Sequence, residues 1–551
     1  MPLNLLTDPW LPVVRAKTGA VLIRPAEIVS ALADDPVLNP NWPRADLNIA
    51  TYEFLIGLIF AVMPAESKRG WLQRWEKAPT IAELDAALAP FAAAFNLDGE
   101  GPRFLQDIDD LPGDPNPCDA LFIDSAGDST RKKNADLMVK RDRYQVLSRP
   151  AAAMALYTLQ AMAPAGGAGN RTSMRGGGPL ITLVRPPSAS GFSQPTLWQT
   201  IWANTPLQNE DEALTEKPER AFPWLKKTRT SEKDSTYPEH GHPVQQFFGM
   251  PRRIRLVFER NSNRRACDLT GMVDDVIVTG FVQRPRGVNY AGWEHPLTPY
   301  YRTKPGEPPL PRHPSAGRFG YRQWVDVAIG KGDGLRMPAA AVDVYVRERA
   351  FNIQEQDNIN IPRLLVAGWA MDNMKPLDFI EDEQQLHIAA TPERGREIDN
   401  LARQMAEAAD VAVRDTVWNV RRALFSEQAT VDTEKTALDA IRESFYDATE
   451  DDFHEILARA AAADPVRDDE LRKSWLDILR RRALLQFDAA TSSSYSDVMR
   501  GARVVDAKKS LLALFKGWRK MKSKTLAEWI GLPVEPPPAK AKSRKKKGVP
   551  V

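Results

Sequence analysis

Thr391–Phe425, TPERGREIDNLARQMAEAADVAVRDTVWNVRRALF, is the stretch at which the pattern of the chain changes. It opens with a helix-start signal, because Thr391 suits an N-cap, Pro392 the first helical position and Glu393 the positive end of the helix dipole. Apolar residues then recur at helical spacing: Ile398, Leu401, Met405, Ala408, Val417, Val420 and Leu424. We therefore predict a long amphipathic helix that begins near residue 391.

Further amphipathic segments follow this helix, with short connections between them. They are Glu434–Ala448, Phe453–Ala461, Glu470–Phe487 and Ala502–Met521. Such lengths and connections are typical of a bundle with roughly four main helices, so we predict a four-helix bundle over residues 390–525. The tail, residues 536–551, reads PPPAKAKSRKKKGVPV. Its composition predicts disorder, and its basic residues either contact nucleic acid or are only solvated.

The region before the bundle, residues 1–385, mixes helical and strand-like patterns. The expected helices are Leu47–Val62, Ile81–Phe95 and Ala151–Met162. The expected strands are Trp10–Val14, Leu180–Val184, Ile254–Phe258, Asp275–Thr279 and Val342–Val346. Long irregular stretches separate them, so we predict an α+β fold: a large mixed N-terminal domain with long loops, followed by the helical bundle.

The composition limits the class of protein. The chain has 551 residues, which is too long for one ordinary core, and its 43% hydrophobic and 26% charged content is typical of a soluble globular protein. Because the net charge is only +2, any nucleic-acid binding depends on local patches. Two distant cysteines, Cys118 and Cys267, argue against a disulfide framework. The N-terminus lacks the features of a signal peptide, and the longest apolar run, near Phe54–Met63, is too short to span a bilayer. We therefore expect a cytoplasmic protein without a membrane partner.

Motifs for catalysis are missing from the sequence. It contains no G-x-x-x-x-G-K-[ST], no H-E-x-x-H and no G-x-S-x-G. The only close histidine pair, His240 and His242, has no third ligand at a conventional spacing. We therefore expect no enzyme activity, no cofactor and no metal site.

A glycine-rich segment is the strongest sign of ligand contact. Residues 165–179 read AGGAGNRTSMRGGGP and contain six glycines together with Arg171 and Arg175. Glycine lets a backbone approach a partner closely, and arginine supplies forked donors for phosphate or base edges. Because a strand-like segment follows where a helix would be needed, a nucleotide-binding turn does not fit. A flexible linker and a nucleic-acid contact both remain open on composition alone.

Basic residues gather in three further places. A loop over residues 131–149 carries Arg131, Lys132, Lys133, Lys140, Arg141, Arg143 and Arg149. Arg252, Arg253 and Arg255 lie close together, and Arg284 and Arg286 stand in GFVQRPRG. Each of these groups could contact phosphate. A solvated surface, or ion pairs with nearby acids, would account for the same basic residues equally well.

Five blocks, taken in order, resemble the CasA family, the large subunits of type I-E CRISPR Cascade complexes. The blocks are NLLTDPWLPV from Asn4, LFIDSAGDSTRKKNAD from Leu121, the glycine segment from Gly167, WEHPLTP from Trp293 and GWAMDNMKPLDFIEDE from Gly368. The resemblance implies a mixed domain with a C-terminal four-helix bundle, and it implies a non-catalytic subunit. It further implies partners: other Cascade subunits, guide RNA, double-stranded target DNA and a recruited helicase-nuclease.

The resemblance also assigns roles to residues. It implies a loop against the DNA minor groove at Gly167, Ala168, Gly169, Asn170 and Arg171. Asn373 would be an amide wedge that promotes duplex opening at the protospacer-adjacent motif, and Lys132, Lys133 and Asn134 belong to a flexible loop that would add salt-dependent affinity. A basic finger would be Arg284 or Arg286, and the sequence leaves both open. Cys267 stands alone where some relatives have a zinc-binding cluster, so no zinc is expected. The alternative is a scaffold that contacts protein and guide RNA without reading a DNA motif.

Overall fold

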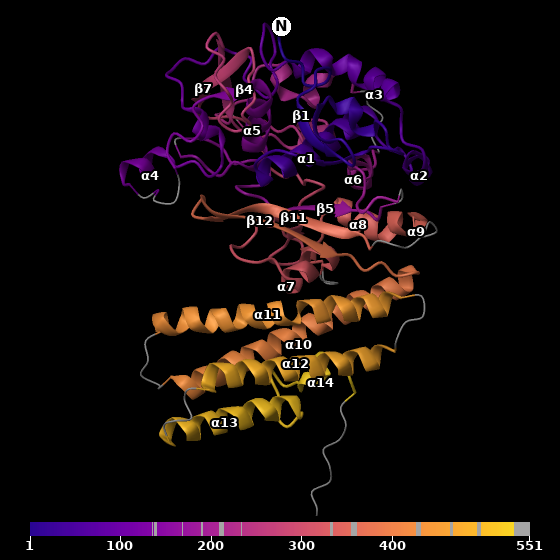
Figure 1. Ribbon diagram of the computed structural model, residues 1–551, viewed down its shortest axis with the longest axis vertical. Helices are drawn as coiled ribbons and strands as arrows, with labels where there is room; N and C mark the ends of the chain where they lie inside the picture. Colours follow the sequence, from indigo (N-terminus) through magenta and orange to yellow (C-terminus); the bar gives the residue numbers. More distant parts are fainter. Residues whose placement is uncertain are drawn as a thin grey trace, which may run out of the picture. The chain divides into compact units, whose positions relative to one another are not determined.

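The computed structural model describes residues 1–134, 136, 140–167, 169–188, 191–208, 214–232, 234–330, 334–353, 361–425, 431–462, 467–492 and 498–533. The predicted tail, residues 536–551, lies outside these ranges, and so does Ala168. The chain divides into two compact units. The first comprises Met1–Phe319 and Gln323–Ile388, and the second comprises Gly320–Arg322 and the chain from Ala389 onward. The predicted α+β class with a helical C-terminal region is confirmed (Figure 1).

A buried helix, α1 (Ala45–Val62), lies at the centre of the first unit. It packs against α5 (Arg149–Met162) and α6 (Leu197–Asn204). Phe54 of α1 is surrounded edge-on by the rings of Trp10, Phe95, Phe104, Tyr157 and Phe248. Among the described helices α1 alone is long and apolar enough to cross a membrane, yet 83% of that window is buried inside the protein. The helix predicted at Leu47–Val62 is thus confirmed, and its burial makes it a core helix.

Four small antiparallel sheets surround this core in the described part of the chain. Their orders are β2-β1-β3, β10-β8-β9, β12-β11-β5 and β4-β7-β6. The strands are β1 (Leu11–Arg15), β2 (Gly19–Ile23), β3 (Val37–Pro40), β4 (Leu147–Ser148), β5 (Ile181–Arg185), β6 (Arg253–Arg260), β7 (Val276–Arg284), β8 (Tyr300–Tyr301), β9 (Leu310–Pro311), β10 (Arg336–Met337), β11 (Arg363–Asp372) and β12 (Lys375–Gln385). The other α-helices of this unit are α2 (Lys68–Glu76), α3 (Ile81–Leu88), α4 (Asp128–Lys132), α8 (Ala340–Val344) and α9 (Ala350–Ile353). The residues of α7 (Tyr321–Trp324) are divided between the two units.

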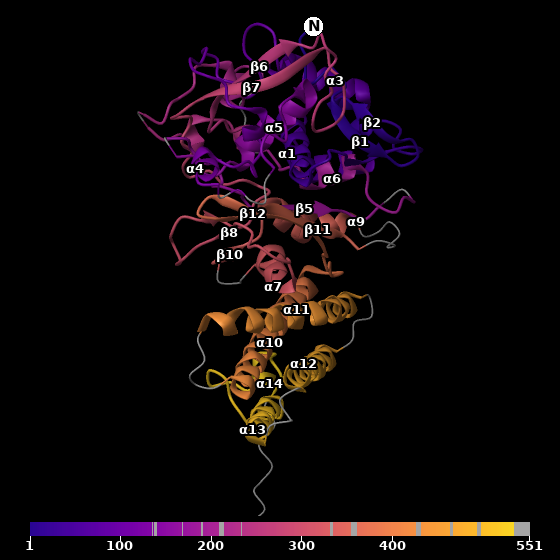
Figure 2. The ribbon, with the colours of Figure 1, turned by 60° about the vertical axis from the view of Figure 1, so that its left-hand side comes forward.

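The hairpin of β11 and β12 is the longest sheet element and pairs along its other edge with β5 (Figure 2). Its turn holds Asn373 and Met374, both at positive φ. Read alone, Ala367–Asp372, AGWAMD, predicts a glycine turn that presents a polar tip, but Gly368 lies within β11, opposite Ile380, and the turn comes after it. A side chain at Gly368 would meet the carbonyl oxygen of Pro179 at 2.5 Å, so glycine is required by close packing rather than by a turn.

The expected strand at Val342–Val346 was also wrong. The segment is helical, formed by α8 and the wider turn Tyr345–Arg349. Its buried residues, Val342, Tyr345 and Arg349, recur every three to four positions, which is the helical period. The β-branched composition had suggested a strand, and the burial pattern overrode it.

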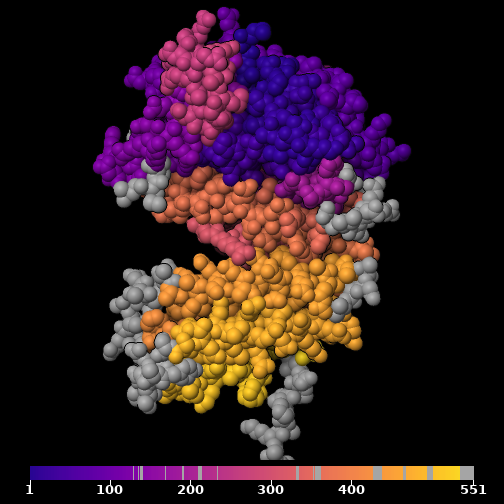
Figure 3. Space-filling view, in the orientation of Figure 1, coloured from indigo at the N-terminus to yellow at the C-terminus, as the bar shows by residue number. Residues whose placement is uncertain are grey.

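The second unit contains four long helices in its described residues: α10 (Pro392–Leu424), α11 (Val431–Ala461), α12 (Asp468–Thr491) and α13 (Val498–Phe515). A short helix, α14 (Leu526–Trp529), packs against α10. Trp475 of α12 donates its indole hydrogen to the carbonyl of Met405, and Tyr321 stacks on Phe453 beside it. The helices form a closely packed surface in the space-filling view (Figure 3).

Two boundaries of the bundle differ from the prediction. α11 is one continuous helix that contains both predicted segments, Glu434–Ala448 and Phe453–Ala461, together with the acids Asp451 and Asp452 between them. The helix α13 ends at Phe515 rather than Met521. There Gly517 adopts positive φ, and the amides of Gly517 and Trp518 bond back to Leu514 and Ala513 in a Schellman-type cap.

Candidate nucleic-acid interface

The glycine segment has an exposed half and a buried half. Gly166, Gly167 and Gly169 are exposed, whereas Gly177 and Gly178 are buried. The segment follows the last turn of α5 and leads into β5, so both of its ends are held by the core. A freely flexible linker does not describe the buried half.

The buried half packs against the stem of the β11–β12 hairpin. A Cβ on Gly178 would lie 2.3 Å from the carbonyl oxygen of Trp369, and one on Gly177 would lie 2.6 Å from Cα of Pro164 and 3.3 Å from Sδ of Met374. The amide of Gly178 also donates to the carbonyl of Met162 at 2.9 Å. Glycine is needed here because no side chain fits, and the contact places the hairpin tip beside the glycine segment.

The exposed half forms a tight turn. The amide of Asn170 donates to the carbonyl of Gly167 at 2.8 Å, and Gly167 and Gly169 have φ of 61° and 81°. The guanidinium of Arg171 donates from Nε to the hydroxyl of Ser231 at 3.0 Å. Apart from its chain neighbours, no residue in the described ranges lies within 4 Å of a Cβ placed on Gly167, so this side of the turn has room for a partner.

The two candidates for the basic finger occupy different places. The amide of Arg286 donates to the carbonyl of Gly169 at 2.9 Å, and the Arg286 side chain is 58% exposed, with Glu232 as its ion-pair partner. Arg284 ends β7, and its guanidinium lies against Gly113. Arg286 thus lies against the exposed glycine turn.

Asn373 lies at the exposed tip of the β11–β12 hairpin. Its side-chain amide donates to a carboxylate oxygen of Asp372 at 3.0 Å. Because Asn373 and Met374 both adopt positive φ, the turn is tight and fixes the direction of the tip. The neighbouring Met374, which contacts Gly177, ties this tip to the glycine segment.

Arg175 is not available to a ligand, although it belongs to the glycine segment. Its guanidinium is 2% exposed and pairs with both carboxylate oxygens of Glu53, at 2.7 and 2.9 Å. The imidazole of His295 lies 3.5 Å from the same carboxylate. Burial alone would raise the pKa of Glu53, but the charges and hydrogen bonds of Arg175 and His295 together outweigh it and lower this pKa. Burial, aided by Arg175, lowers the pKa of His295 to about 4.

Arg252 lies beneath the exposed glycine turn. It is 6% exposed, and a Cβ on Gly166 would lie 2.6 Å from its Nη1. One Nη2 hydrogen bond reaches the carbonyl of Pro164, and Nε has no hydrogen-bond partner in the described residues. Burial lowers the pKa of Arg252 to about 10. Its neighbours in the predicted basic cluster are engaged, because Arg253 pairs with Asp107 and Arg255 with Asp110.

The basic loop carries a mixture of exposed and paired cations. Lys132, Lys133 and Asn134 are exposed at and just after the end of α4. Arg141 is held by Asp136 and by Oδ1 of Asn134, whereas Arg149 lies at the start of α5 and pairs with Asp274 and Asp98. Arg149 is therefore a structural residue rather than part of a free basic surface.

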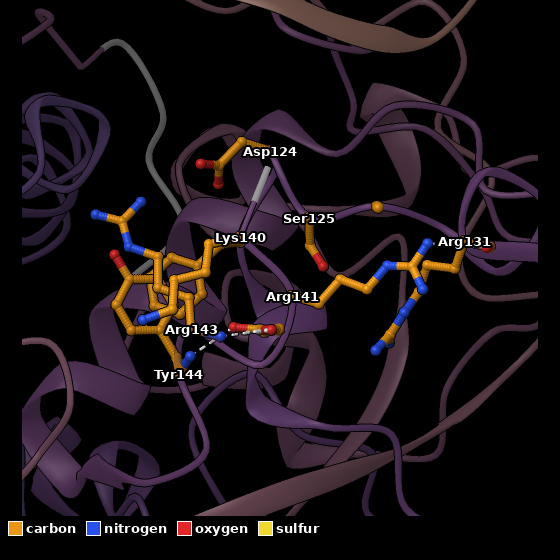
Figure 4. A pocket seen from close by; sticks show the side chains of 10 residues that line it. Asp124, Ser125, Arg131, Lys140, Arg141, Arg143 and Tyr144 are labelled. Atoms are coloured by element: carbon orange, nitrogen blue, oxygen red, sulfur yellow. Dashed lines mark hydrogen bonds between the residues drawn. The ribbon is translucent and has the colours of Figure 1, made fainter. Parts of the chain in front are cut away.

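A small cavity opens within this loop (Figure 4). Its volume is about 90 Å³, and it is lined by Asp119, Phe122, Asp124, Ser125, Ala126, Arg131, Lys140, Arg141, Arg143 and Tyr144. The Asp119 carboxylate accepts the amides of Arg143 and Tyr144 at 3.0 and 2.6 Å, which closes the base of the loop. Asp124 in turn pairs with Arg44. These acids offset part of the positive charge, and the exposed lysines of the loop, Lys132, Lys133 and Lys140, are suited to phosphate contact.

Two supporting residues were missed from the sequence. Glu53 was detectable, because it is an isolated acid within the apolar helix run TYEFLIGLIF and such an acid needs a buried partner. Arg252 was noticed only as part of a cluster, and no sequence signal separates it from its paired neighbours. Within the described ranges, no group of three potential metal ligands occurs. Cys118 and Cys267 are both buried and free.

A family model for the CRISPR-associated protein Cse1 matches residues 4–486. The chain belongs to the Cse1 family. The predicted resemblance to CasA is confirmed by the same match and by solved structures.

Solved Cse1 and CasA structures share the fold over nearly the whole chain. The CasA of Thermus thermophilus superposes with a TM-score of 0.69 at 17% identity, covering 94% of this chain and 100% of that one. Cse1 from Acidimicrobium ferrooxidans gives 0.68 at 17% identity, covering 96% and 98%. A chain of a CRISPR RNA-guided surveillance complex gives 0.65 at 15% identity, covering 93% and 99%. At these identities the likeness concerns the Cse1 fold and not individual site residues.

Proposed function

We propose that this Cse1-family chain is the non-catalytic large subunit of an RNA-guided Cascade complex and reads a protospacer-adjacent motif in double-stranded DNA. The reading surface would consist of the glycine turn at residues 167–171, Arg286 and the Asn373 hairpin tip. The single observation that carries the proposal is the hydrogen bond from the Arg286 amide to the Gly169 carbonyl, because it joins a basic side chain to the exposed glycine turn.

The local chemistry supports reading in the minor groove. An exposed turn of glycines brings backbone donors and acceptors close to a groove that side chains enter poorly. The minor groove distinguishes mainly A·T from G·C, so such a surface would read a short motif with some tolerance. Longer sequence identity would then come from pairing between guide RNA and target strand.

Duplex opening would follow at the hairpin tip. Asn373 carries an amide that can replace base hydrogen bonds, and its turn is held in place by the Met374 contact with Gly177. Separating the first base step costs a few kcal/mol, which phosphate contacts would offset. Lys132 and Lys133 are exposed cations suited to such contacts.

The partners follow from the family. Other Cascade subunits and guide RNA would surround the chain, since one solved structure with this fold belongs to an RNA-guided surveillance complex. A helicase-nuclease would be recruited to the opened target, and the complex would act in the cytoplasm. The chain itself would supply no chemical step.

The test uses the assembled complex and a library of motifs flanking one target. Gly169→Asp places a negative charge on the turn, and Asn373→Gly removes the amide while keeping the positive φ that the turn requires. The matched control is Gly306→Asp, because Gly306 also has positive φ, of 85°, with open space around it. We expect the first two variants to lose affinity and motif preference, and the control to behave as wild type.

The scaffold alternative makes the opposite prediction. If Gly169→Asp and Asn373→Gly retained both affinity and motif preference while complex assembly was intact, the chain would not read the motif through this surface.

A further inference from the structure

An exposed cationic turn follows the last long helix of the bundle. Residues 516–524 read KGWRKMKSK, with five basic residues and no acid. A tight reversal closes the segment, because Met521 pairs with Lys524 and Lys522 and Ser523 adopt positive φ. The residues lie beyond the family match, which ends at residue 486. We call this segment the 516–524 turn.

Three tryptophans on and around this turn each lie under a cation. Lys516 Nζ is 4.5 Å from the ring centre of Trp518, and Lys524 Nζ is 4.9 Å from that of Trp529. Trp418 of α10 has the guanidinium of Arg422 at 4.5 Å. Arg519, next to Trp518 in sequence, lies 5.9 Å from the Trp418 ring, so the turn reaches this face of α10.

The rings are unusually exposed. Trp518 is 73% exposed and Trp418 is 47% exposed, although large aromatic side chains are normally among the most buried groups of a fold. Neither ring is needed for the bundle core, which is built around Trp475 and Phe453. Exposed aromatic rings of this kind mark binding surfaces.

The charge of the surface is strongly positive. Two acids nearby are engaged: the buried Asp415 pairs with Arg519, and Glu528 accepts the amide of Thr525. Lys520 and Lys522 are exposed on the turn. Hydrogen bonds with Thr525 lower the pKa of Glu528, and the charges of Lys520 and Lys524 add to this lowering. The cations still outnumber the acids, so the surface attracts an anionic partner.

We propose that Trp418, Trp518 and the 516–524 turn form a binding site for single-stranded nucleic acid. Unpaired bases would stack on the two rings, and the phosphates would lie along the lysines, which is the general way in which proteins hold single strands without reading sequence. An acidic protein segment could pair with the lysines of the turn, but it has no flat groups to stack on the two tryptophan rings. In a duplex the bases are already stacked on one another, so they are not available to these rings. The site lies in the second unit and does not depend on the glycine turn reading a motif.

The test measures binding of a labelled oligothymidylate of about 20 nucleotides to the full chain by fluorescence anisotropy. In all proteins the six basic residues of the tail are replaced by serine, so that the tail's charges do not contribute; they are Lys540, Lys542, Arg544, Lys545, Lys546 and Lys547. We expect Trp518→Ala to weaken binding at least about fivefold and Trp418→Ala to weaken it similarly, because a stacked base contributes about 1–3 kcal/mol. Leu485→Ala is the matched control, since it removes a 63% exposed apolar side chain from α12 and should leave affinity unchanged.

Further arms identify the ligand class. The same proteins are titrated with a blunt duplex, with polyglutamate and with vesicles of phosphatidylcholine and phosphatidylserine. Of these ligands, single-stranded DNA should lose the most affinity when Trp518 is replaced by alanine. The double variant Lys520→Glu, Lys522→Glu should bind single-stranded DNA with a weaker dependence of affinity on salt concentration. Equal binding by Trp518→Ala and wild type, or a tryptophan-dependent affinity seen only for duplex, polyglutamate or vesicles, would overturn the proposal.

Discussion

Two separate variants, Gly178→Ala and Gly167→Ala, place an alanine in the same left-handed backbone conformation. Only the alanine at position 178 would also overlap with a neighbouring strand. Both glycines have nearly the same positive φ, 63° and 61°. A Cβ on Gly178 would lie 2.3 Å from the Trp369 carbonyl oxygen, whereas a Cβ on Gly167 has nothing within 4 Å. Left-handed backbone costs an alanine about 1–2 kcal/mol at either position.

The overlap adds a second cost at Gly178 alone. A carbon and a carbonyl oxygen normally approach no closer than about 3.3 Å, so β11 would have to move by about 1 Å. Overpacking of this size costs about 1–3 kcal/mol. We therefore expect Gly178→Ala to destabilise the hairpin by about 1–3 kcal/mol more than Gly167→Ala, an additional factor of about 5 to 150 in the local opening constant.

Hydrogen–deuterium exchange of peptides covering β11 measures this opening directly, because it reports the free energy of local unfolding within one unit. Faster exchange in Gly178→Ala than in Gly167→Ala is the expected result. Equal exchange rates in the two variants would refute the reasoning that the buried glycines hold the hairpin against the segment.

Three further predictions concern separate parts of the molecule. Arg286→Ala should weaken motif binding by the assembled complex by about 1–3 kcal/mol, whereas Arg284→Ala, whose guanidinium lies against Gly113, should bind as wild type; equal losses would contradict the assignment of the finger. Replacing Lys132 and Lys133 together by alanine should reduce the slope of log affinity against log salt by about 2, measured by titration at several salt concentrations, and an unchanged slope would exclude phosphate contacts there. Burial lowers the pKa of His295 from 6.5 to about 4, so between these values the unfolded chain binds a proton that the folded chain does not. The free energy of unfolding should therefore fall as the pH drops through this window, and His295→Gln should flatten that part of the urea-unfolding profile; an identical pH dependence would count against the assignment.

The main helices and most strands were predictable from local pattern. α1 and α10 follow from long apolar or amphipathic runs, and the strands at Ile181, Arg253 and Val276 follow from β-branched alternation. The segment around Val342 was mistaken for a strand, because its composition favours β structure while its burial follows a helical period. Propensity is a weak guide where packing decides.

The site was predictable in parts but not as a surface. The glycine segment stood out by composition. The different roles of its two halves depend on packing, above all on the contact of Gly178 with Trp369, which is distant in sequence. Arg175 resembled a ligand-binding arginine and is instead buried with Glu53. The choice between Arg284 and Arg286 needed the Gly169 hydrogen bond, which no local pattern reports.

The most direct test of the proposed function changes the DNA rather than the protein. Inosine in place of guanine, or diaminopurine in place of adenine, removes or adds the amino group in the minor groove, whereas 7-deazaguanine alters only the major-groove face. The assembled complex is titrated with targets that carry each analogue at every position of its preferred motif. Minor-groove reading by the glycine turn, Arg286 and Asn373 predicts that the minor-groove analogues change affinity and that 7-deazaguanine does not. Sensitivity to 7-deazaguanine alone would contradict it.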